Sequence, residues 1–541
     1  MIYSDWYWLN DYSKTFLNRG YFKGDPKVRV REIADYAEKI LGIEDFSNKF
    51  FGYMAKGYYS LSSPVWSNLG KEKALSASCF GSIIEDSLDS ILNAGREIGM
   101  MSKYGGGTSM YLGNIRPRGT SISVGGLADG PNHYAKIYDT IIDKCKQGET
   151  RRGACATYLD IAHPDIKEFL QIGTEGNEIQ NLQTGVCVSN DFMEQMIEGN
   201  VEYREVWAAV LQSRKETGFP YIFFTDNVND NSPYNDLGGR ITHSNLCSEI
   251  ALANNKDESF VCVVGSINLL HWDEIKETDA IEVYTQFLNA VNIDFVNKAE
   301  HLPGMSRAYR FAKNHAAIGV GVLGYHSYLQ RNLIPFESLQ AKQKNHELFK
   351  LISERCSSES KRLHDELGFV SIRPGYANVT QMAIAPTKSS SFILGQVSMG
   401  IEPIKSNYFI KDLSKIKEVY KNPFLKEELA KYNLDTEEVW ASILSKDGSV
   451  AHLDFPTKDV FKSFIEISPK EVVLQAAQRQ KFIDQSQSLN LSIHPSVSVK
   501  EINKLYISAW KEGVKTLYYQ FSQSAAQSFS REINDCVTCE G

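Results

Sequence analysis

Hydrophobic and polar residues alternate with helical spacing in the first part of the chain. Residues 31–41 show this pattern, and Gly42 is placed to end that helix. Residues 86–103 carry leucines and isoleucines at positions that share one helix face, and Asp86 or Ser87 can cap its start. Both segments are therefore predicted to be helices that pack an apolar face against a core.

A third helix is predicted over residues 132–147, with Asn132 as its cap and Gly148 as its end. Beyond it, short strand-like runs alternate with helical ones. The predicted strands are residues 154–161, 185–189, 221–225, 260–264, 318–323 and 381–385, and helices are predicted at 164–172 and 190–198. This alternation is typical of an α/β fold with parallel strands.

The composition is that of an ordinary globular protein, with 42% hydrophobic and 23% charged residues. A formal net charge of −8 argues against binding to a nucleic-acid backbone. The chain does not open with a basic segment followed by an apolar stretch, and no long apolar run interrupts it, so neither a signal peptide nor a membrane span is predicted. We therefore expect a protein of the cytoplasm.

The nine cysteines are an odd number spread along the chain, which argues against a structural disulfide framework. A lone cysteine is most often a small buried hydrophobe. Cys536 and Cys539, however, form a C-x-x-C pair in a polar final segment that is typical of a mobile tail. The pair suits a redox dithiol. Half of a zinc site is the alternative, although no second such pair completes four ligands.

The segment Asn245-Leu246-Cys247-Ser248-Glu249 is the richest in chemistry. If the segment is extended, its first, third and fifth residues share one face, so an amide, a thiol and a carboxylate stand together. They offer a hydrogen-bond donor and acceptor, a sulfur able to act as nucleophile or radical, and a general base. An ordinary polar strand end is the alternative that this pattern alone leaves open.

Five segments, in order, resemble the catalytic large subunit of the ribonucleotide reductases over nearly the whole chain. The triplet Asn245-x-Cys247-x-Glu249 resembles the active-site triplet of that family. The other segments are Ser76-Ala77-Ser78-Cys79 and Cys262 with Ser266-Ile267-Asn268-Leu269 for a redox cysteine pair, residues 385–391 with 400–403 for a substrate-phosphate loop, and Thr516-Leu517-Tyr518-Tyr519-Gln520 for a radical relay.

The resemblance implies radical chemistry on a ribonucleotide. Cys247 would become a thiyl radical that abstracts the 3′ hydrogen, and Glu249 would take the 3′-hydroxyl proton. Asn245 would hold the substrate hydroxyl and orient the carboxylate of Glu249. A radical at C3′ makes the 2′-hydroxyl easier to remove, because hydroxide is otherwise a poor leaving group.

Two further cysteines would supply the electrons. By the same resemblance, Cys79 would protonate the leaving 2′-oxygen, and Cys79 and Cys262 would then close into a disulfide. Cys536 and Cys539 would reduce that disulfide by thiol exchange. Thioredoxin or glutaredoxin would in turn reduce the tail.

The fold that the resemblance implies is a ten-stranded α/β barrel with Cys247 on an internal finger loop. The expected division is a helical N-terminal region over residues 1–75, the catalytic barrel over 76–523 and a flexible redox tail over 524–541. Only 78 residues precede Cys79, which is too few for the ATP-cone domain of many family members, so no overall activity switch is expected. Such a chain suits a bacterium or a virus-infected cell.

Nucleotides would bind at two places. The predicted substrate contacts are Ser63, Thr387, Lys388, Ser389, Ser390 and Ser391, whose hydroxyls, backbone N–H groups and one ammonium suit phosphate. An effector, a dNTP or ATP, would bind where helices 86–103 and 132–147 form a homodimer interface. Its predicted contacts are Asp86, Arg116 and, in the loop 147–153, Arg151, for which a solvated surface loop is the alternative.

The radical source distinguishes the subclasses. Adjacent Tyr518 and Tyr519 favour class I, in which a separate metal-containing small (beta) subunit supplies the radical and this chain binds no metal and no covalent cofactor. Class I favours diphosphate substrates. Aromatic core packing is the alternative for the tyrosines, and an adenosylcobalamin-dependent class II enzyme is the alternative for the chain. A non-catalytic nucleotide-binding regulator would be expected to lack the triplet or the redox pair.

Overall fold

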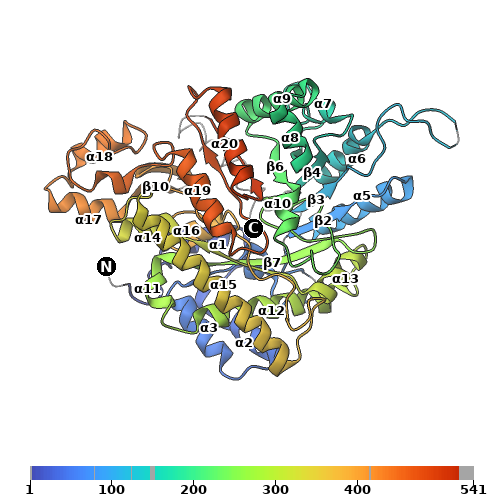
Figure 1. Ribbon diagram of the computed structural model, residues 1–541. Helices are drawn as coiled ribbons and strands as arrows, with labels where there is room; N and C mark the ends of the chain where they lie inside the picture. Colours follow the sequence, from blue (N-terminus) through green and yellow to red (C-terminus); the bar gives the residue numbers. More distant parts are fainter. Residues whose placement is uncertain are drawn as a thin grey trace.

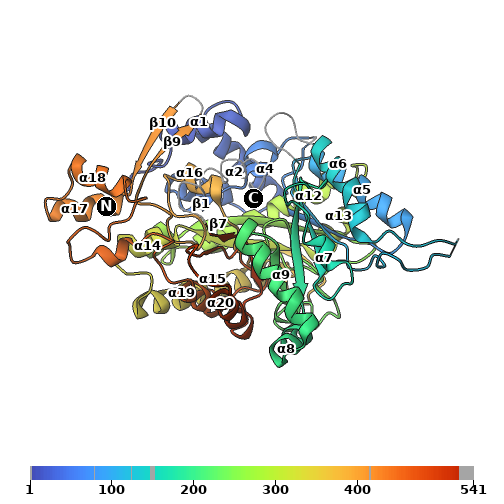
Figure 2. The same cartoon turned by 90° about the horizontal axis from the view of Figure 1, so that it is seen from above.

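Parallel strands and helices alternate around a central barrel (Figures 1 and 2). The computed structural model describes residues 3–522 except 73, 78, 124, 146–152 and 414–415, and it leaves out the side chains of 19, 411–413 and 416–419. One half of the barrel is a parallel sheet in the order β2 (Cys79–Ile83), β3 (Thr108–Tyr111), β4 (Cys155–Asp160), β5 (Leu182–Val188) and β6 (Tyr221–Phe224).

The second half closes the barrel with five further extended segments. β7 (Phe260–Asn268) pairs antiparallel with β2 and parallel with β8 (Ile318–Leu323). Single parallel bridges then join β8 to Met382 and Ile384 to Gln487. β11 (Leu491–Ser492) pairs with β13 (Gln520–Phe521), and β12 (Thr516–Leu517) returns to β6. The predicted α/β barrel is therefore confirmed, and its two parallel halves run antiparallel to each other.

The N-terminal segment is helical, as predicted, and packs beneath the barrel. It contains α1 (Asp11–Gly20), α2 (Pro26–Leu41), α3 (Phe46–Ala55), β1 (Tyr59–Ser60), which pairs with β7, and α4 (Ser63–Asn68). α2 ends at Gly42, which adopts a left-handed φ of 66°. Glycine adopts that conformation without steric cost, so the predicted helix end is confirmed.

Helices α5 (Leu88–Lys103) and α6 (Pro131–Lys144) lie side by side at one edge of the molecule (Figures 1 and 2). The Tyr138 hydroxyl joins them by donating to Ile91 O at 3.0 Å. Ser87 caps α5, as predicted. The cap predicted for α6 is wrong: Gly130 is the cap and Pro131 opens the helix, because proline lacks the N–H that a first turn leaves unpaired. Asn132 therefore lies inside α6.

The remaining elements surround the barrel. They are α7 (Ile166–Phe169), α8 (Asn190–Glu198), α9 (Val201–Thr217), α10 (Thr225–Asp230), η1 (Leu269–His271), α11 (Trp272–Ile275), α12 (Ala280–Ala299), α13 (Ser306–His315), α14 (Tyr325–Arg331), α15 (Leu339–Leu367), α16 (Lys388–Ile393), α19 (Pro469–Gln480) and α20 (Val499–Lys511). The helix predicted over 164–172 is shorter than expected, whereas that over 190–198 is confirmed. In the described ranges no helix is long and apolar enough to cross a membrane.

A smaller projecting part lies on the side of the molecule opposite α5 and α6 (Figure 1). It contains the hairpin of β9 (Tyr408–Leu413) and β10 (Ile416–Lys421), followed by α17 (Pro423–Lys431), α18 (Glu437–Leu444) and η2 (Lys458–Phe461). The pattern of strands predicted from the sequence did not include this hairpin.

Candidate active site

Cys79 and Cys262 lie opposite each other where the two halves of the barrel meet. The antiparallel register of β2 and β7 pairs their Cα atoms directly. Directly opposed Cα atoms in such a pair are about 4.5–5.5 Å apart, which falls within the range of about 4.4–6.8 Å that a disulfide requires. Both side chains are buried. The fold therefore brings the two predicted redox cysteines into a position where they can form a disulfide.

The side chain of Gln485 fixes the surroundings of Cys262. Its amide nitrogen lies 3.5 Å from Cys262 Sγ and also donates to Ile318 O at 2.9 Å and Thr380 Oγ1 at 3.1 Å. Its amide oxygen accepts from Ala251 N at 3.2 Å. Burial raises the pKa of the Cys262 thiol well above its usual range, and the hydrogen bond from Gln485 acts in the opposite direction.

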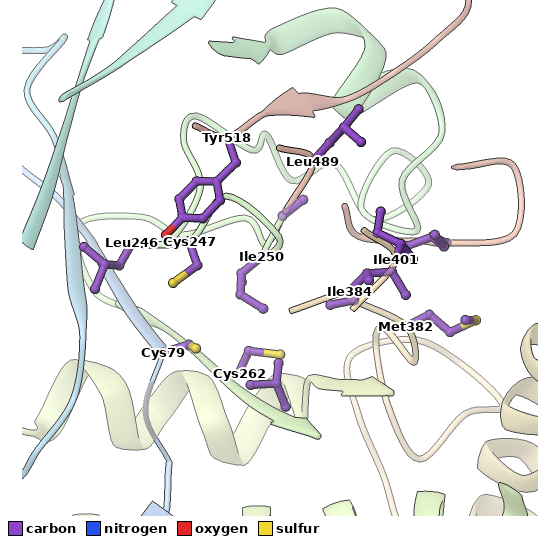
Figure 3. Packing of buried hydrophobic residues seen from close by; sticks show 14 of the residues in the cluster. Cys79, Leu246, Cys247, Ile250, Cys262, Met382, Ile384, Ile401, Leu489 and Tyr518 are labelled. Carbon is purple, nitrogen blue, oxygen red and sulfur yellow. The ribbon is translucent and has the colours of Figure 1, made fainter. Parts of the chain in front are cut away.

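The segment from Asn245 to Glu249 is a turn inside the barrel, so the extended strand considered in the sequence analysis is wrong. Ser248 adopts a φ of 68°, and its N–H donates to Asn245 O at 3.4 Å. Asn245 Oδ1 accepts from Ile250 N at 3.1 Å and so holds the turn together. A left-handed φ is uncommon outside glycine and is often found at functional sites. Figure 3 shows that the turn directs the Cys247 sulfur toward Cys79 and Cys262.

Ser488 contacts two members of the triplet. Its hydroxyl lies 2.5 Å from Cys247 O and 3.1 Å from Glu249 Oε2. The other carboxylate oxygen, Glu249 Oε1, lies 4.0 Å from Cys79 Sγ. The resemblance assigned the orientation of this carboxylate to Asn245, whereas the hydroxyl that reaches it here belongs to Ser488. The amide nitrogen of Asn245 is buried and has no hydrogen-bond partner among the described residues.

Tyr518 and Tyr519 are buried and in ring contact, with centroids 4.3 Å apart and planes inclined at 57°. In Figure 3 the Tyr518 hydroxyl points toward Cys247. Tyr518 N donates to Leu489 O at 2.9 Å, and Tyr519 N donates to Asn490 Oδ1 at 3.0 Å, so the pair is held at its backbone. The aromatic pair therefore ends beside the cysteine at the tip of the turn.

The predicted phosphate loop leads into the short helix α16. Thr387 adopts a φ of 52°, and its hydroxyl accepts from Gly400 N at 2.7 Å, which ties the two motif segments together. Ser389 Oγ is buried without a hydrogen-bond partner among the described residues. Lys388 is buried, with Nζ 5.8 Å from the centroid of the Tyr519 ring. The other predicted contacts, Ser63, Ser390 and Ser391, are buried as well.

The predicted effector contacts are only partly described. Arg116 Nε lies 2.6 Å from Asp86 Oδ2, and Arg116 N donates to Asp86 Oδ1 at 3.2 Å. Both side chains are about one third exposed, so a ligand can reach them. Arg151 lies outside the described residues, as do the tail cysteines Cys536 and Cys539.

Gln485 and Ser488 are site residues that the sequence analysis missed. Both belong to the run Asp484-Gln485-Ser486-Gln487-Ser488, which connects α19 to β11 and lies within the barrel. Five consecutive polar residues between Phe482-Ile483 and Leu489 form an unusual pattern for a loop. That pattern was the available signal, because a buried polar run must find hydrogen-bond partners in the core.

Comparison with known proteins identifies a family and relatives that match nearly the whole chain. Residues 77–201, 196–372 and 370–520 match the family described as ribonucleotide reductase, barrel domain. A putative ribonucleoside-diphosphate reductase large subunit of Frog virus 3 is 31% identical over 93% of this chain and 94% of the viral protein. The large subunit of Invertebrate iridescent virus 3 is 30% identical over 97% of each chain.

A solved structure gives the same result. The class Id ribonucleotide reductase alpha subunit of Actinobacillus ureae is 49% identical, with a TM-score of 0.92 over 97% of this chain and 99% of that one. The chain therefore belongs to the ribonucleotide reductase barrel family. Within that family it is a large subunit, an oxidoreductase of deoxyribonucleotide synthesis.

Proposed function

We propose that the chain is the large subunit of a class I ribonucleotide reductase that receives its radical from a separate small subunit and reduces ribonucleoside diphosphates. The observation that carries this proposal is the contact between the rings of Tyr518 and Tyr519, with the Tyr518 hydroxyl directed at Cys247. The class Id neighbour supports the class, and the names of the viral relatives support a diphosphate substrate.

The first half of the reaction uses the turn. An electron and a proton leave the Cys247 thiol through Tyr518, and the resulting thiyl radical takes the 3′ hydrogen atom. Glu249 accepts the 3′-hydroxyl proton, a general-base role that requires a carboxylate held within hydrogen-bond reach. The contact with Ser488 supports this assignment, because it fixes one carboxylate oxygen. The buried, unpaired amide nitrogen of Asn245 is suited to donate to a substrate hydroxyl.

The second half of the reaction uses the redox pair. Cys79 gives a proton to the 2′-oxygen, which leaves as water. Cys79 and Cys262 together supply two electrons and close into a disulfide, and Cys247 returns a hydrogen atom to C3′. The dithiol of Cys536 and Cys539, itself reduced by thioredoxin or glutaredoxin, reopens the disulfide by exchange. Reductants of this kind keep thiols reduced in the cytoplasm, where we place the reaction.

The nucleotide sites complete the proposal. Lys388 and the hydroxyls of the loop around Ser389 bind the substrate phosphates, and Asp86 with Arg116 binds a dNTP or ATP effector that selects the substrate.

A homodimer forms through α5 and α6. The exposure of Leu88, Leu92 and Ile137 on these helices supports the dimer, because an interface would remove these apolar side chains from water. Residues 1–75, 76–523 and 524–541 are the proposed N-terminal region, barrel and redox tail.

An adenosylcobalamin-dependent reaction is the second candidate. A vitamin B12-dependent ribonucleoside-diphosphate reductase of Thermoplasma acidophilum is 27% identical over 90% of this chain and 67% of that protein. In the deciding assay the purified chain receives ribonucleoside diphosphates, effectors and dithiothreitol. One arm contains adenosylcobalamin and the other a metal-loaded small subunit from the same genome. Product only in the second arm is the expected result, and turnover with cobalamin alone would refute the class I assignment.

A further inference from the structure

The two redox sulfurs lie in chemically opposite surroundings. Cys262 Sγ has a hydrogen-bond donor beside it, the Gln485 amide at 3.5 Å. Cys79 Sγ has an acceptor beside it, Glu249 Oε1 at 4.0 Å. A donor stabilises a thiolate, whereas a neighbouring carboxylate repels one. The Gln485 donor therefore favours negative charge on Cys262, whereas burial and the carboxylates of Glu249 and Asp484 oppose it there.

The two cysteines also differ in how easily an incoming thiol can reach them. Cys79 is 5% exposed, whereas Cys262 is completely buried. An incoming thiol therefore meets the sulfur of Cys79 first. In thiol–disulfide exchange one sulfur is attacked and the other departs with the electron pair, and access and leaving-group stability decide which is which. Access favours attack at Cys79, and the Gln485 donor favours departure of Cys262.

We propose that the Cys79–Cys262 disulfide opens in one direction, with attack at Cys79 Sγ and departure of Cys262 as a thiolate held by the Gln485 amide. This inference rests on the redox pair of the proposed function. The reductant's thiolate forms a sulfur–sulfur bond to Cys79, the Cys79–Cys262 bond breaks, and its electron pair stays on Cys262. The reductant's second thiolate then displaces Cys79, and two protons restore both thiols while the reductant leaves as a disulfide.

Gln485 is a positioning residue in this step, because it acts through the sulfur of Cys262. Its side chain cannot turn away easily, since the two amide hydrogens are shared among Ile318 O, Thr380 Oγ1 and Cys262 Sγ and the amide oxygen accepts from Ala251 N. The donor is therefore in place before the thiolate forms. Among the described residues, Gln485 is the one side chain within hydrogen-bond distance of the completely buried Cys262 thiol, whose pKa burial raises.

The test uses the full chain with Cys536→Ser and Cys539→Ser, so that only an added thiol can open the disulfide. The protein is oxidised with diamide, mixed with glutathione, quenched in acid, alkylated with N-ethylmaleimide and mapped by peptide mass spectrometry. Glutathione on Cys79 with alkylated Cys262 is the expected pattern. Glutathione on Cys262, or an even split, would overturn the proposal. Failure of Cys79 and Cys262 to form any disulfide would instead refute the redox pair itself.

The rate of opening supplies a second readout. Gln485→Met removes the donor at similar volume, and Gln485→Glu keeps an acceptor for Ala251 N while placing a carboxylate beside the sulfur. We expect opening by glutathione to slow about 10- to 100-fold in Gln485→Met, from a charge-assisted hydrogen bond of about 1.5–3 kcal/mol, and further in Gln485→Glu. Gln475→Met is the matched control, since Gln475 bonds to Phe336 O and Tyr325 away from the thiols. An unchanged rate in folded Gln485→Met would contradict the proposal.

Discussion

Replacing Ser488 with alanine removes the hydroxyl that reaches both Cys247 O at 2.5 Å and Glu249 Oε2 at 3.1 Å. Glu249 and Ser488 are buried, so water does not replace the lost hydrogen bond readily. A hydrogen bond to a charged group contributes about 1.5–3 kcal/mol. If the carboxylate is the general base, its loss of orientation lowers kcat about 10- to 100-fold. The KM for the ribonucleotide changes much less, because the phosphate contacts remain intact.

The assay is steady-state reduction with the small subunit present, compared with Ser360→Ala. Ser360, on α15, is equally buried and its hydroxyl bonds to Asn378, so its loss costs a similar number of hydrogen bonds without touching the triplet. We expect both variants to lose a similar few degrees in Tm, and Ser488→Ala alone to lose turnover. Equal kcat in the two variants would refute the assignment of Ser488 as the residue that orients Glu249.

Three further substitutions test other parts of the molecule. Lys388→Met removes the one cation of the phosphate loop and should raise the KM for ribonucleoside diphosphates at least about 10-fold; an unchanged KM would exclude Lys388 from phosphate binding. Arg116→Ala should abolish the change in base preference that different dNTPs induce, measured as product ratios in mixed-substrate assays, because Asp86 would lose its partner. Lys515 is buried against Asp484 O and Asn231 O, and burial lowers its pKa to about 8. Between pH 8 and 10 the unfolded chain therefore binds more protons than the folded protein. The free energy of unfolding of the wild type minus that of Lys515→Met, measured by urea titration, should rise with pH in this range by at most about 1.4 kcal/mol per pH unit. A flat difference would show that Lys515 keeps its proton.

The sequence predicted those parts of the fold that local patterning controls. The strand at Ile318–Leu323, the helix at Asn190–Glu198 and the helix end at Gly42 follow from periodicity and glycine conformation alone. The helix start at Pro131 was missed, because an asparagine cap and a proline at the first position compete as signals.

The site was predicted less completely, because its parts meet only through the barrel. The triplet was recognisable by its residues, but its turn depends on a left-handed Ser248 that no periodicity reveals. Ser488 and Gln485 come from a segment far along the chain and reach Glu249 and Cys262 only when β8, Met382 and Gln487 pair in order. Long-range hydrogen bonds of this kind give only a weak signal in a single sequence. Here that signal is a run of polar residues in a segment that is buried in the core.

A comparison of two tyrosine variants tests whether the radical reaches Cys247 through Tyr518. Tyr518→Phe removes the hydroxyl that faces Cys247, whereas Tyr221→Phe alters a ring 4.7 Å from Tyr518 whose hydroxyl donates to Gln183 instead. Both variants are assayed with the small subunit, substrate and effector. We expect deoxyribonucleotide formation to fall by at least about three orders of magnitude in Tyr518→Phe and to be retained in Tyr221→Phe, since phenylalanine cannot pass a proton and an electron at ordinary potentials. Wild-type turnover by Tyr518→Phe would contradict it.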